Sequence, residues 1–409
     1  MRGSAECRPY RKTSCAQAEE VSDATRPGPV SQGQGQGQEQ RANWFELFFD
    51  LVFVATLYVM AHELRGDPSP ADFGAFLILF FPAWWGWVNL MMTVNVFGPA
   101  NPRALAMLVA AVPGFGLMAA ASPEGLGDRA WAYALGAAWV RLVHLPLWWG
   151  RTHRGEALLP WWQPLLYGLL PAALWAASAA VPGAGRFVLW AVAVGLEILL
   201  LTAGGGLSGA FGAMSAGHLV ERVGLFVVIA LGESVLTTVT TLADSFTPAS
   251  GTAALAGFAT ITVLAGDYYL RGSPGAARVL DLAERTRAAG AIRDSVMYLP
   301  FLLLSGIAVL AAALGTAVTE PLHTLPPGAL WALCGGLLAF HTANAALSLR
   351  FGDRPRALLS WYPLCPVLDF GVLYPAGLVL PAWATVAVAA LLIGGHLWLT
   401  SRPRRQRRH

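Results

Sequence analysis

Charged residues are scarce in this chain of 409 residues: Asp, Glu, Lys and Arg together make up 12% of it, whereas soluble domains contain roughly 25%. Lys12 is the only lysine, so nearly every positive charge is an arginine. Hydrophobic residues account for 56% of the chain. This composition excludes a soluble globular protein. Apolar stretches of about 20 residues follow one another with short connections, which is typical of an integral membrane protein.

Common catalytic and metal-binding motifs are also missing. The sequence contains no HExxH, no GxSxG, no P-loop and no dinucleotide-binding fingerprint. Its four cysteines form no CxxC pair, so neither a disulfide framework nor a thiolate metal site is indicated. We therefore expect no catalytic residue set, no cofactor and no metal centre that can be named from motifs.

The chain ends are polar and the middle is apolar. Residues 1–42 include the low-complexity run QGQGQGQEQ and lack an apolar signal region, so we expect a disordered cytoplasmic tail. Two membrane halves follow, 43–203 and 204–400. The basic tail 401–409 is expected to meet anionic lipid headgroups of the bilayer. Nothing aromatic or foldable accompanies its charge, which argues against a nucleic-acid partner.

We predict an all-α polytopic membrane helix bundle of about twelve transmembrane helices. The predicted spans are 44–64, 73–97, 103–121, 129–149, 160–181, 186–203, 218–241, 250–270, 294–315, 328–349, 357–378 and 380–400. Arginines concentrate in alternate connections and in the C-terminal tail. By the positive-inside rule, this asymmetry supports twelve spans with both termini in the cytoplasm.

Weak internal similarity indicates two parallel six-helix repeats, with chance similarity between apolar helices as the alternative. ELFFDLVFV from Glu46 and ERVGLFVVIALG from Glu221 each open a predicted helix with a glutamate. WAYALGAAWVRLVH (131–144) and WALCGGLLAFH (331–341) each run from Trp-Ala through glycine to histidine.

The first span carries two carboxylates at helical spacing. Glu46 and Asp50 are four residues apart and therefore share one helix face. Because like charges repel in an apolar setting, we expect a basic partner, Arg222 or Arg141. The pair either forms a cation or proton site or fixes helix packing.

The run HLVERVGLFVVIALGESVLTT (218–238) is apolar enough to cross a bilayer but keeps four ionisable residues. His218, Glu221 and Arg222 share one face at its start. Glu233 lies about three turns, or about 16 Å, beyond Arg222. Charged side chains inside a membrane span are costly and usually have a function. Glu233 is therefore the strongest candidate for handling a substrate, ion or proton.

Other ionisable residues in the spans form a secondary group: Arg141, His144, Glu197, Asp267, His341 and Asp369. A single histidine on an apolar helix is more often structural than a ligand. Arg141 in mid-helix requires a carboxylate partner. Tryptophan groups such as Trp84, Trp85 and Trp87 are interpreted as an aromatic belt at the membrane interface.

Two of these stretches together resemble a known family. ELFFDLVFV (46–54) and HLVERVGLFVVIALGES (218–234) are similar to the paired signatures of the bacterial low temperature requirement A family of multi-pass membrane proteins, in the same order. The resemblance extends over about residues 42–400. It implies a multi-pass membrane protein named for growth in the cold, without an established biochemical activity.

The resemblance is weaker in the second half. Where the family often has an aromatic WWxYFD-like run in the eighth span, this chain has AGDYYL (265–270). Where the family often has a histidine in the ninth span, this chain has YLPF (298–301), with Pro300 in its place. If those positions complete a polar site, the site is altered here, and Asp267 is the candidate to compensate.

The leading hypothesis is a transporter or ion-conducting protein in which Glu46, Asp50, Glu221, Arg222 and Glu233 form a polar network between the first and seventh spans. Its solute or ion is not determined by the sequence. One alternative is a membrane-embedded enzyme or a metal- or cofactor-binding protein that uses His144, His218 or His341. Another is a non-catalytic membrane factor in cold adaptation, for which the buried charges are structural.

Overall fold

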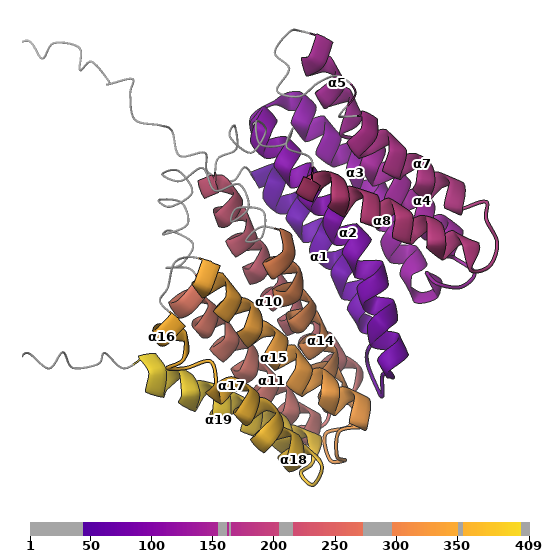
Figure 1. Ribbon diagram of the computed structural model, residues 1–409. Coiled ribbons are helices and arrows are strands. Elements are labelled where there is room, and N and C mark those ends of the chain that lie inside the picture. Colours follow the sequence, from indigo (N-terminus) through magenta and orange to yellow (C-terminus); the bar gives the residue numbers. More distant parts are fainter. Residues whose placement is uncertain are drawn as a thin grey trace, which may run out of the picture. The chain divides into compact units, whose positions relative to one another are not determined.

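The computed structural model describes residues 44–153, 162, 165–203, 216–272, 297–350 and 355–401, and most of these residues are in helices (Figure 1). The α-helices are α1 (Trp44–His62), α2 (Pro70–Phe97), α3 (Pro102–Ala121), α4 (Ala130–Leu142), α5 (Leu145–His153), α7 (Leu170–Ser178), α8 (Gly185–Ala203), α10 (Ala216–Asp244), α11 (Pro248–Asp267), α14 (Leu299–Thr319), α15 (Pro327–Arg350), α16 (Pro355–Leu358), α17 (Leu364–Pro366), α18 (Tyr374–Gly377) and α19 (Ala382–Ser401). The described residues also include a 3-10 turn, η1 (Ser122–Glu124), and three π-helical segments, η2 (Leu165–Leu169), η3 (Tyr268–Gly272) and η5 (Val367–Leu373). The predicted all-α class is confirmed.

Within those ranges, eight helices are long and apolar enough to cross a membrane, judged by length and composition. They are Trp44–His62, Pro70–Phe97, Pro102–Glu124, Glu221–Asp244, Pro248–Leu270, Leu299–Thr319, Pro327–Arg350 and Ala382–Ser401. The other four predicted spans contain α4 with α5, η2 with α7, α8, and α16 to α18. Their helices are short, interrupted or not among these eight, so the count of twelve stays a prediction.

Several long helices begin with the same local chemistry, a polar cap followed by proline. Ser69 Oγ accepts from the Asp72 amide, and Asp72 Oδ2 accepts from the Ser69 amide at 2.8 Å, which forms a capping box before Pro70. Asn101 caps α3 and Thr247 caps α11 in the same way, each directly before a proline. Proline suits the first helical position because its missing N–H has no partner to lose there.

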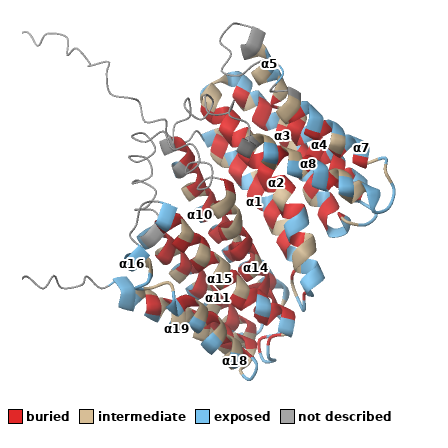
Figure 2. Ribbon diagram, viewed as in Figure 1, coloured by how far each residue is buried: buried red, intermediate tan, exposed pale blue. Residues whose placement is uncertain are grey.

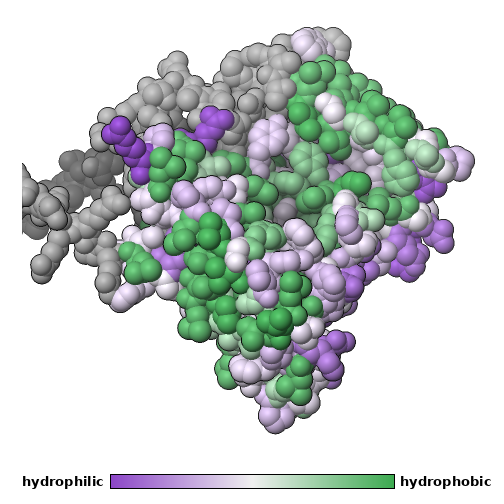
Figure 3. Space-filling model, turned by 60° about the horizontal axis from the view of Figure 1, so that its bottom comes forward, coloured by the Kyte–Doolittle hydropathy of each residue, from purple (hydrophilic) through white to green (hydrophobic). Residues whose placement is uncertain are grey.

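The helices pack around α14 and around the contact between α1 and α10. α14 contacts α15, α10 and α11, and α1 contacts α3 and α10. Figure 2 shows buried residues along most of α14 and α15. Figure 3 shows apolar side chains spread over the outer surface on one face, as expected where lipid replaces water.

The aromatic belt prediction is wrong for three tryptophans of α2. Trp84, Trp85 and Trp87 are fully buried. Trp84 and Trp87 stack with ring centroids 4.9 Å apart, and both rings contact Phe226 of α10. The Trp84 Nε1 donates to the Met297 carbonyl oxygen at 2.7 Å. These rings fill the space between helices, because their polar N–H groups find partners inside the protein.

Glycines allow two helix pairs to approach closely. A Cβ at Gly136 of α4 would lie 2.7 Å from the carbonyl oxygen of Gly114 on α3, and a Cβ at Gly336 of α15 would lie 2.8 Å from that of Gly306 on α14. Small residues at such crossings let backbones come together in membranes. Gly136 and Gly336 are each the sixth residue of the two similar Trp-Ala segments. The two similar segments therefore place a glycine at the same position, and in each case this glycine lies at a close helix crossing.

All described residues belong to one compact unit, Gln40–His409. The predicted tails 1–42 and 401–409 lie outside the described residues, except for Ser401. The predicted junction between the two membrane halves falls between residues 203 and 204, and the described residues end there at Ala203. The boundaries of the two halves remain predictions.

Candidate functional site

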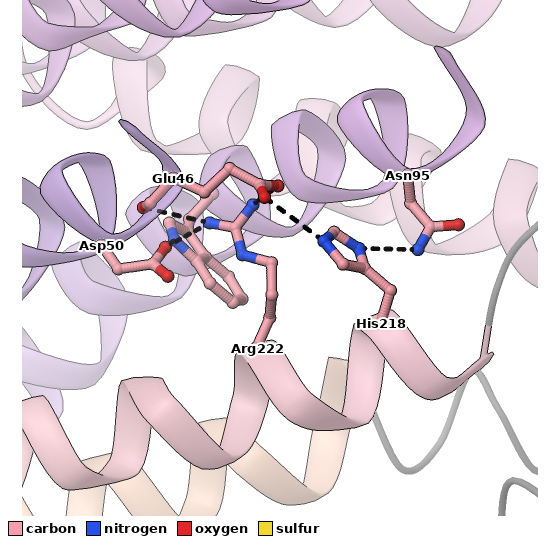
Figure 4. Close-up of polar contacts among 6 residues, drawn as sticks. Glu46, Asp50, Asn95, His218 and Arg222 are labelled. Atoms are coloured by element: carbon pink, nitrogen blue, oxygen red, sulfur yellow. Dashed lines mark hydrogen bonds and ion pairs between the residues drawn. The ribbon is translucent and has the colours of Figure 1, made fainter. Parts of the chain in front are cut away.

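The first candidate feature is an arginine between two carboxylates. Glu46 and Asp50 of α1 are fully buried, as is Arg222 of α10. Arg222 Nη1 donates to Glu46 Oε1 at 2.7 Å, and Arg222 Nη2 donates to Asp50 Oδ1 at 2.5 Å. Figure 4 shows the guanidinium lying between the two carboxylates. Of the two partners predicted for the carboxylates, Arg222 is the one they meet.

His218, one turn before Arg222 on α10, extends this arrangement. Its Nε2 lies 3.3 Å from Glu46 Oε2, and its Nδ1 lies 3.1 Å from Asn95 Nδ2 (Figure 4). With the amide nitrogen of Asn95 facing the ring, Nδ1 must accept, so Nε2 carries the proton that faces Glu46. Trp87 completes the surroundings, because its Nε1 donates to Asp50 Oδ1 at 2.9 Å.

We name Glu46, Asp50, His218 and Arg222 the α1–α10 clasp. With a neutral imidazole, the four side chains carry a net charge of minus one. The Arg222 guanidinium also lies 5.8 Å from the centroid of the Trp87 ring, a favourable cation–π contact. Removing one partner of such a buried set strands a charge and costs about 3–5 kcal/mol. The clasp is therefore suited to holding α1 and α10 together.

Glu221 does not join the clasp, although the sequence analysis placed it in the same network. Its side chain is exposed, whereas the neighbouring Arg222 is fully buried. Adjacent residues on a helix are about 100° apart, so only one of the two can face α1. Of the five residues predicted to form one network, Glu46, Asp50 and Arg222 meet, whereas no described ion pair joins Glu221 or Glu233 to them.

Arg141 of α4 has the carboxylate partner that its position requires. Its Nε and Nη2 donate to the two carboxylate oxygens of Glu197 on α8 at 2.7 and 2.9 Å. Nη1 donates to the Ala137 carbonyl oxygen at 3.0 Å, and the Trp175 ring lies 5.1 Å from the guanidinium carbon. This bidentate, buried pair joins α4 to α8 and is separate from the clasp.

His341 of α15 pairs with Asp369, which lies in the π-helical segment η5. His341 Nδ1 is 3.2 Å from Asp369 Oδ2, and both side chains are buried. The ring of His396 on α19 has its centroid 6.4 Å from that of His341. The pair brings α15 and η5 together. The described residues contain no group of three or more His, Cys, Asp or Glu side chains arranged to hold a metal.

His144 and Asp267 lie apart from these sets. His144 is buried beside η2, where a Cβ at Gly168 would lie 3.2 Å from its Nε2. Asp267 is buried at the last residue of α11, directly before η3. It does not line the crevice around Glu233 described next, so its compensating role stays a prediction.

Glu233 lines a crevice between α1, α10 and α14. The crevice is small, with a volume of about 20 Å³, and is lined by Glu233, Arg65, His62, Tyr58, Ser234 and Thr237 among apolar side chains. The side chain of Glu233 is partly buried and forms no hydrogen bond or ion pair with a described residue. None of the four clasp residues lines this space. We name it the Glu233 crevice.

Sequence reasoning missed three residues at these sites. Trp87 is one of the tryptophans predicted to lie at the membrane interface, and Arg65 comes directly after the first predicted span, 44–64. Asn95 was not considered, although an amide inside an apolar span is itself a signal of a buried polar contact. Arg65 offered no such signal, because only the fold turns it back against α14.

Taken together, the apolar helices and their buried ion pairs define a multi-pass helical membrane protein with a lipid bilayer as its environment. The model of the bacterial low temperature requirement A protein family matches residues 41–396, nearly the whole chain. The chain belongs to this family, as the resemblance of its two signature stretches indicated.

One relative was found among curated proteins. It is an uncharacterized protein of Rhizobium meliloti (strain 1021), 28% identical over 210 residues. The alignment covers 49% of this chain and 51% of the relative, so the match spans about half the length of either protein. This likeness adds no activity to the family assignment.

Proposed function

We propose that the protein transports or conducts a small solute or ion across the bacterial inner membrane, with Glu233 in direct contact with it. The observation that supports this is the contrast between Glu233 and four other acidic residues inside the helices. Glu46, Asp50, Glu197 and Asp369 each meet a basic side chain. Glu233 instead faces a crevice and has no described partner. An unpaired carboxylate inside a membrane protein is retained at a cost, which favours a functional role.

The position of the crevice supports the same proposal. α1 and α10 are the first helices of the two proposed repeats, and substrate sites of transporters lie at the interface between repeats. The crevice is bounded by these two helices and by α14. We include in the proposal the orientation with both termini in the cytoplasm, which the arginine distribution supports. The basic tail would then contact anionic headgroups.

Flux measured in proteoliposomes tests this function. Purified protein is reconstituted, and fluxes of protons, alkali cations and small polar solutes are compared between the wild type and Glu233→Gln. Glu221→Gln is the matched control, because Glu221 lies on the same helix but is exposed. We expect at least one flux that Glu233→Gln abolishes and Glu221→Gln retains. Equal fluxes for wild type and Glu233→Gln across the panel would overturn the proposal.

Two further outcomes would favour the alternatives. Stoichiometric metal or a visible absorption band in the purified protein would indicate a membrane enzyme or a cofactor-binding protein. A loss of stability in Glu233→Gln, without the loss of any flux, would indicate a non-catalytic membrane factor.

A further inference from the structure

An apolar groove lies on the side of the helix bundle where α2, α7, α8 and α14 meet. Its volume is about 640 Å³, and ligand sites in proteins usually enclose roughly 300–1,000 Å³. Trp175 and Trp190 line the groove and are buried, whereas Leu77 and Ile78 line it and are 42% and 53% exposed. The groove therefore reaches from the interior of the bundle to its outer surface, which faces lipid in a membrane.

The lining of the groove is aliphatic and aromatic. Among the described residues that line it there is no carboxylate, no basic side chain, no hydroxyl and no amide side chain. A polar solute would give up its hydrogen bonds to water on entering such a space, at a cost that a hydrocarbon chain does not incur. The groove thus favours an apolar occupant.

Four residues of α8 line the groove along one helix face. They are Phe187, Trp190, Ala191 and Val194, and their spacing places them in one row. From the first to the last, this row extends about 10 Å along the helix axis. The hydrocarbon layer of one leaflet is about 15 Å thick. An acyl chain lying along α8 would therefore contact the groove over most of the thickness of the leaflet.

Arg186 lies at one end of this row. It directly precedes Phe187 at the start of α8, and its Nη1 donates to the carbonyl oxygen of Gly127 at 3.3 Å. Leu126, the neighbour of Gly127, also lines the groove. The guanidinium is thus held beside the end of the groove that Leu126 and Phe187 form, where α8 begins.

The charge of Arg186 is not paired with a carboxylate of any described residue. Arg129, which directly precedes α4, differs in this respect, because its Nε lies 3.5 Å from Glu124 Oε2. Arg186 is partly exposed, and its Nε forms no hydrogen bond. A guanidinium always carries its charge and binds phosphate and carboxylate groups well. At the surface of a bilayer, lipid phosphates are the anions available to it.

We propose that the groove binds a glycerophospholipid of the bilayer, with one acyl chain along α8 and the phosphate on Arg186. The lipid supplies both parts in one molecule, since a free phosphate lacks the chain and a free hydrocarbon lacks the anion. Phe301 of α14 also lines the groove, so the bound chain contacts a helix of each predicted half. The inference is independent of the proposed function, because none of these residues lines the Glu233 crevice.

Native mass spectrometry of the purified full-length protein tests the phosphate contact. Delipidated protein in detergent is titrated with dioleoylphosphatidylglycerol or with dioleoylglycerol, which has the same chains but no phosphate. We expect the wild type to bind the phospholipid about tenfold or more tightly than dioleoylglycerol. Arg186→Gln should bind the two lipids alike, whereas Arg186→Lys should keep most of the preference because it keeps the positive charge. Arg129→Gln is the matched control and should keep the preference in full, since Glu124 already pairs with Arg129.

A second pair of variants tests the chain contact. Ala191 lines the groove, so Ala191→Trp should fill part of it and weaken binding of the phospholipid by about tenfold. Val188→Trp adds the same ring to α8 at a residue that is 62% exposed and does not line the groove, so it should bind as the wild type does. Both positions are exposed, and both variants should elute from size exclusion as the wild type does.

Two results would overturn the inference. One is binding of the phospholipid by Arg186→Gln and Ala191→Trp with the affinity of the wild type. The other is equal weakening by the control variants Arg129→Gln and Val188→Trp, which would show that the lipid adheres to the surface at large.

Photolabelling tests where the chain lies. A phosphatidylglycerol with a diazirine in the middle of one acyl chain is irradiated with the wild type in nanodiscs, and the labelled peptides are identified. Label within residues 77–82 of α2 or 187–194 of α8 that Ala191→Trp removes would support the groove as the site. Label confined to other helices would show that the chain binds elsewhere and that the inference is wrong.

Discussion

The interface between α1 and α10 contains paired charges at one place and an unpaired charge at another. In the clasp, Arg222 forms ion pairs with both Glu46 and Asp50, and all three side chains are fully buried. About 16 Å farther along α10, Glu233 is only partly buried and shares a crevice with Arg65, which has two unmet donors. The clasp pairs each of its charged groups with one of opposite sign, although Asp50 Oδ2 and Arg222 Nε form no hydrogen bond. In the crevice, neither Glu233 nor Arg65 has an ion-pair partner among the described residues, so both charges remain available to bind.

Buried charges in a membrane protein can contribute either to its stability or to binding, and the two regions differ in this respect. Paired groups contribute through the cost of separating them, which is a contribution to stability. Unpaired groups destabilise the empty protein and are favoured only if a ligand, ion or proton meets them. Substitutions at the two places should therefore change different measured quantities.

Arg222→Met should have the largest effect on stability. It leaves two carboxylates buried without their cation, and we expect a loss of about 3–5 kcal/mol in the free energy of unfolding. Reversible unfolding in mixed micelles measures this loss. Unfolding as in the wild type would show that the clasp is not what stabilises the contact between α1 and α10.

Arg141→Met should cost somewhat less, because it strands one carboxylate, Glu197, where Arg222→Met strands two. The expected loss is about 3 kcal/mol in the same unfolding experiment. The double variant Arg141→Met/Glu197→Leu should recover most of it, since replacing both partners of a buried pair with apolar residues is often neutral. A double variant no more stable than the single one would contradict this account of the pair.

Trp87→Phe should have a smaller effect on stability. It removes the indole N–H that donates to Asp50 and keeps most of the aromatic packing. We expect a loss of about 1–2 kcal/mol. Trp85→Phe is the control, because Trp85 is buried on the same helix and donates no described hydrogen bond to a clasp residue. Equal losses for the two variants would remove Trp87 from the support of the clasp.

Glu233→Gln should have the smallest effect on stability, within about 0.5 kcal/mol of the wild type, because no partner loses an interaction. Its effect on flux should nevertheless be the largest of the four variants. Unfolding and flux are measured on the same preparation. A loss of several kcal/mol would place Glu233 with the structural charges and remove the contrast between the two regions.

The residues of the clasp could be predicted from the sequence more completely than those of the crevice. The spacing of Glu46 and Asp50 placed them on one face and required a cation, and Arg222 was one of two candidates. Spacing alone left Arg141 as the other, because periodicity gives the face of a helix and not the helix that covers it. It also kept Glu221 in the network, since only the rotation of α10 against α1 decides which of two adjacent residues is buried.

The sequence by itself determined which segments of the chain lie in the hydrocarbon core of the membrane. The length of each hydrophobic run and the cost of leaving backbone groups unpaired in lipid require helices there. It also identified the residues whose burial would need compensation. Tertiary structure alone decided which charges found partners. Arg222 and Arg141 each lie opposite a carboxylate, whereas the turn at Gly66 and the bare surface at Gly315 bring Arg65 into the crevice with Glu233. These are contacts between residues far apart in the chain, and local sequence does not specify them.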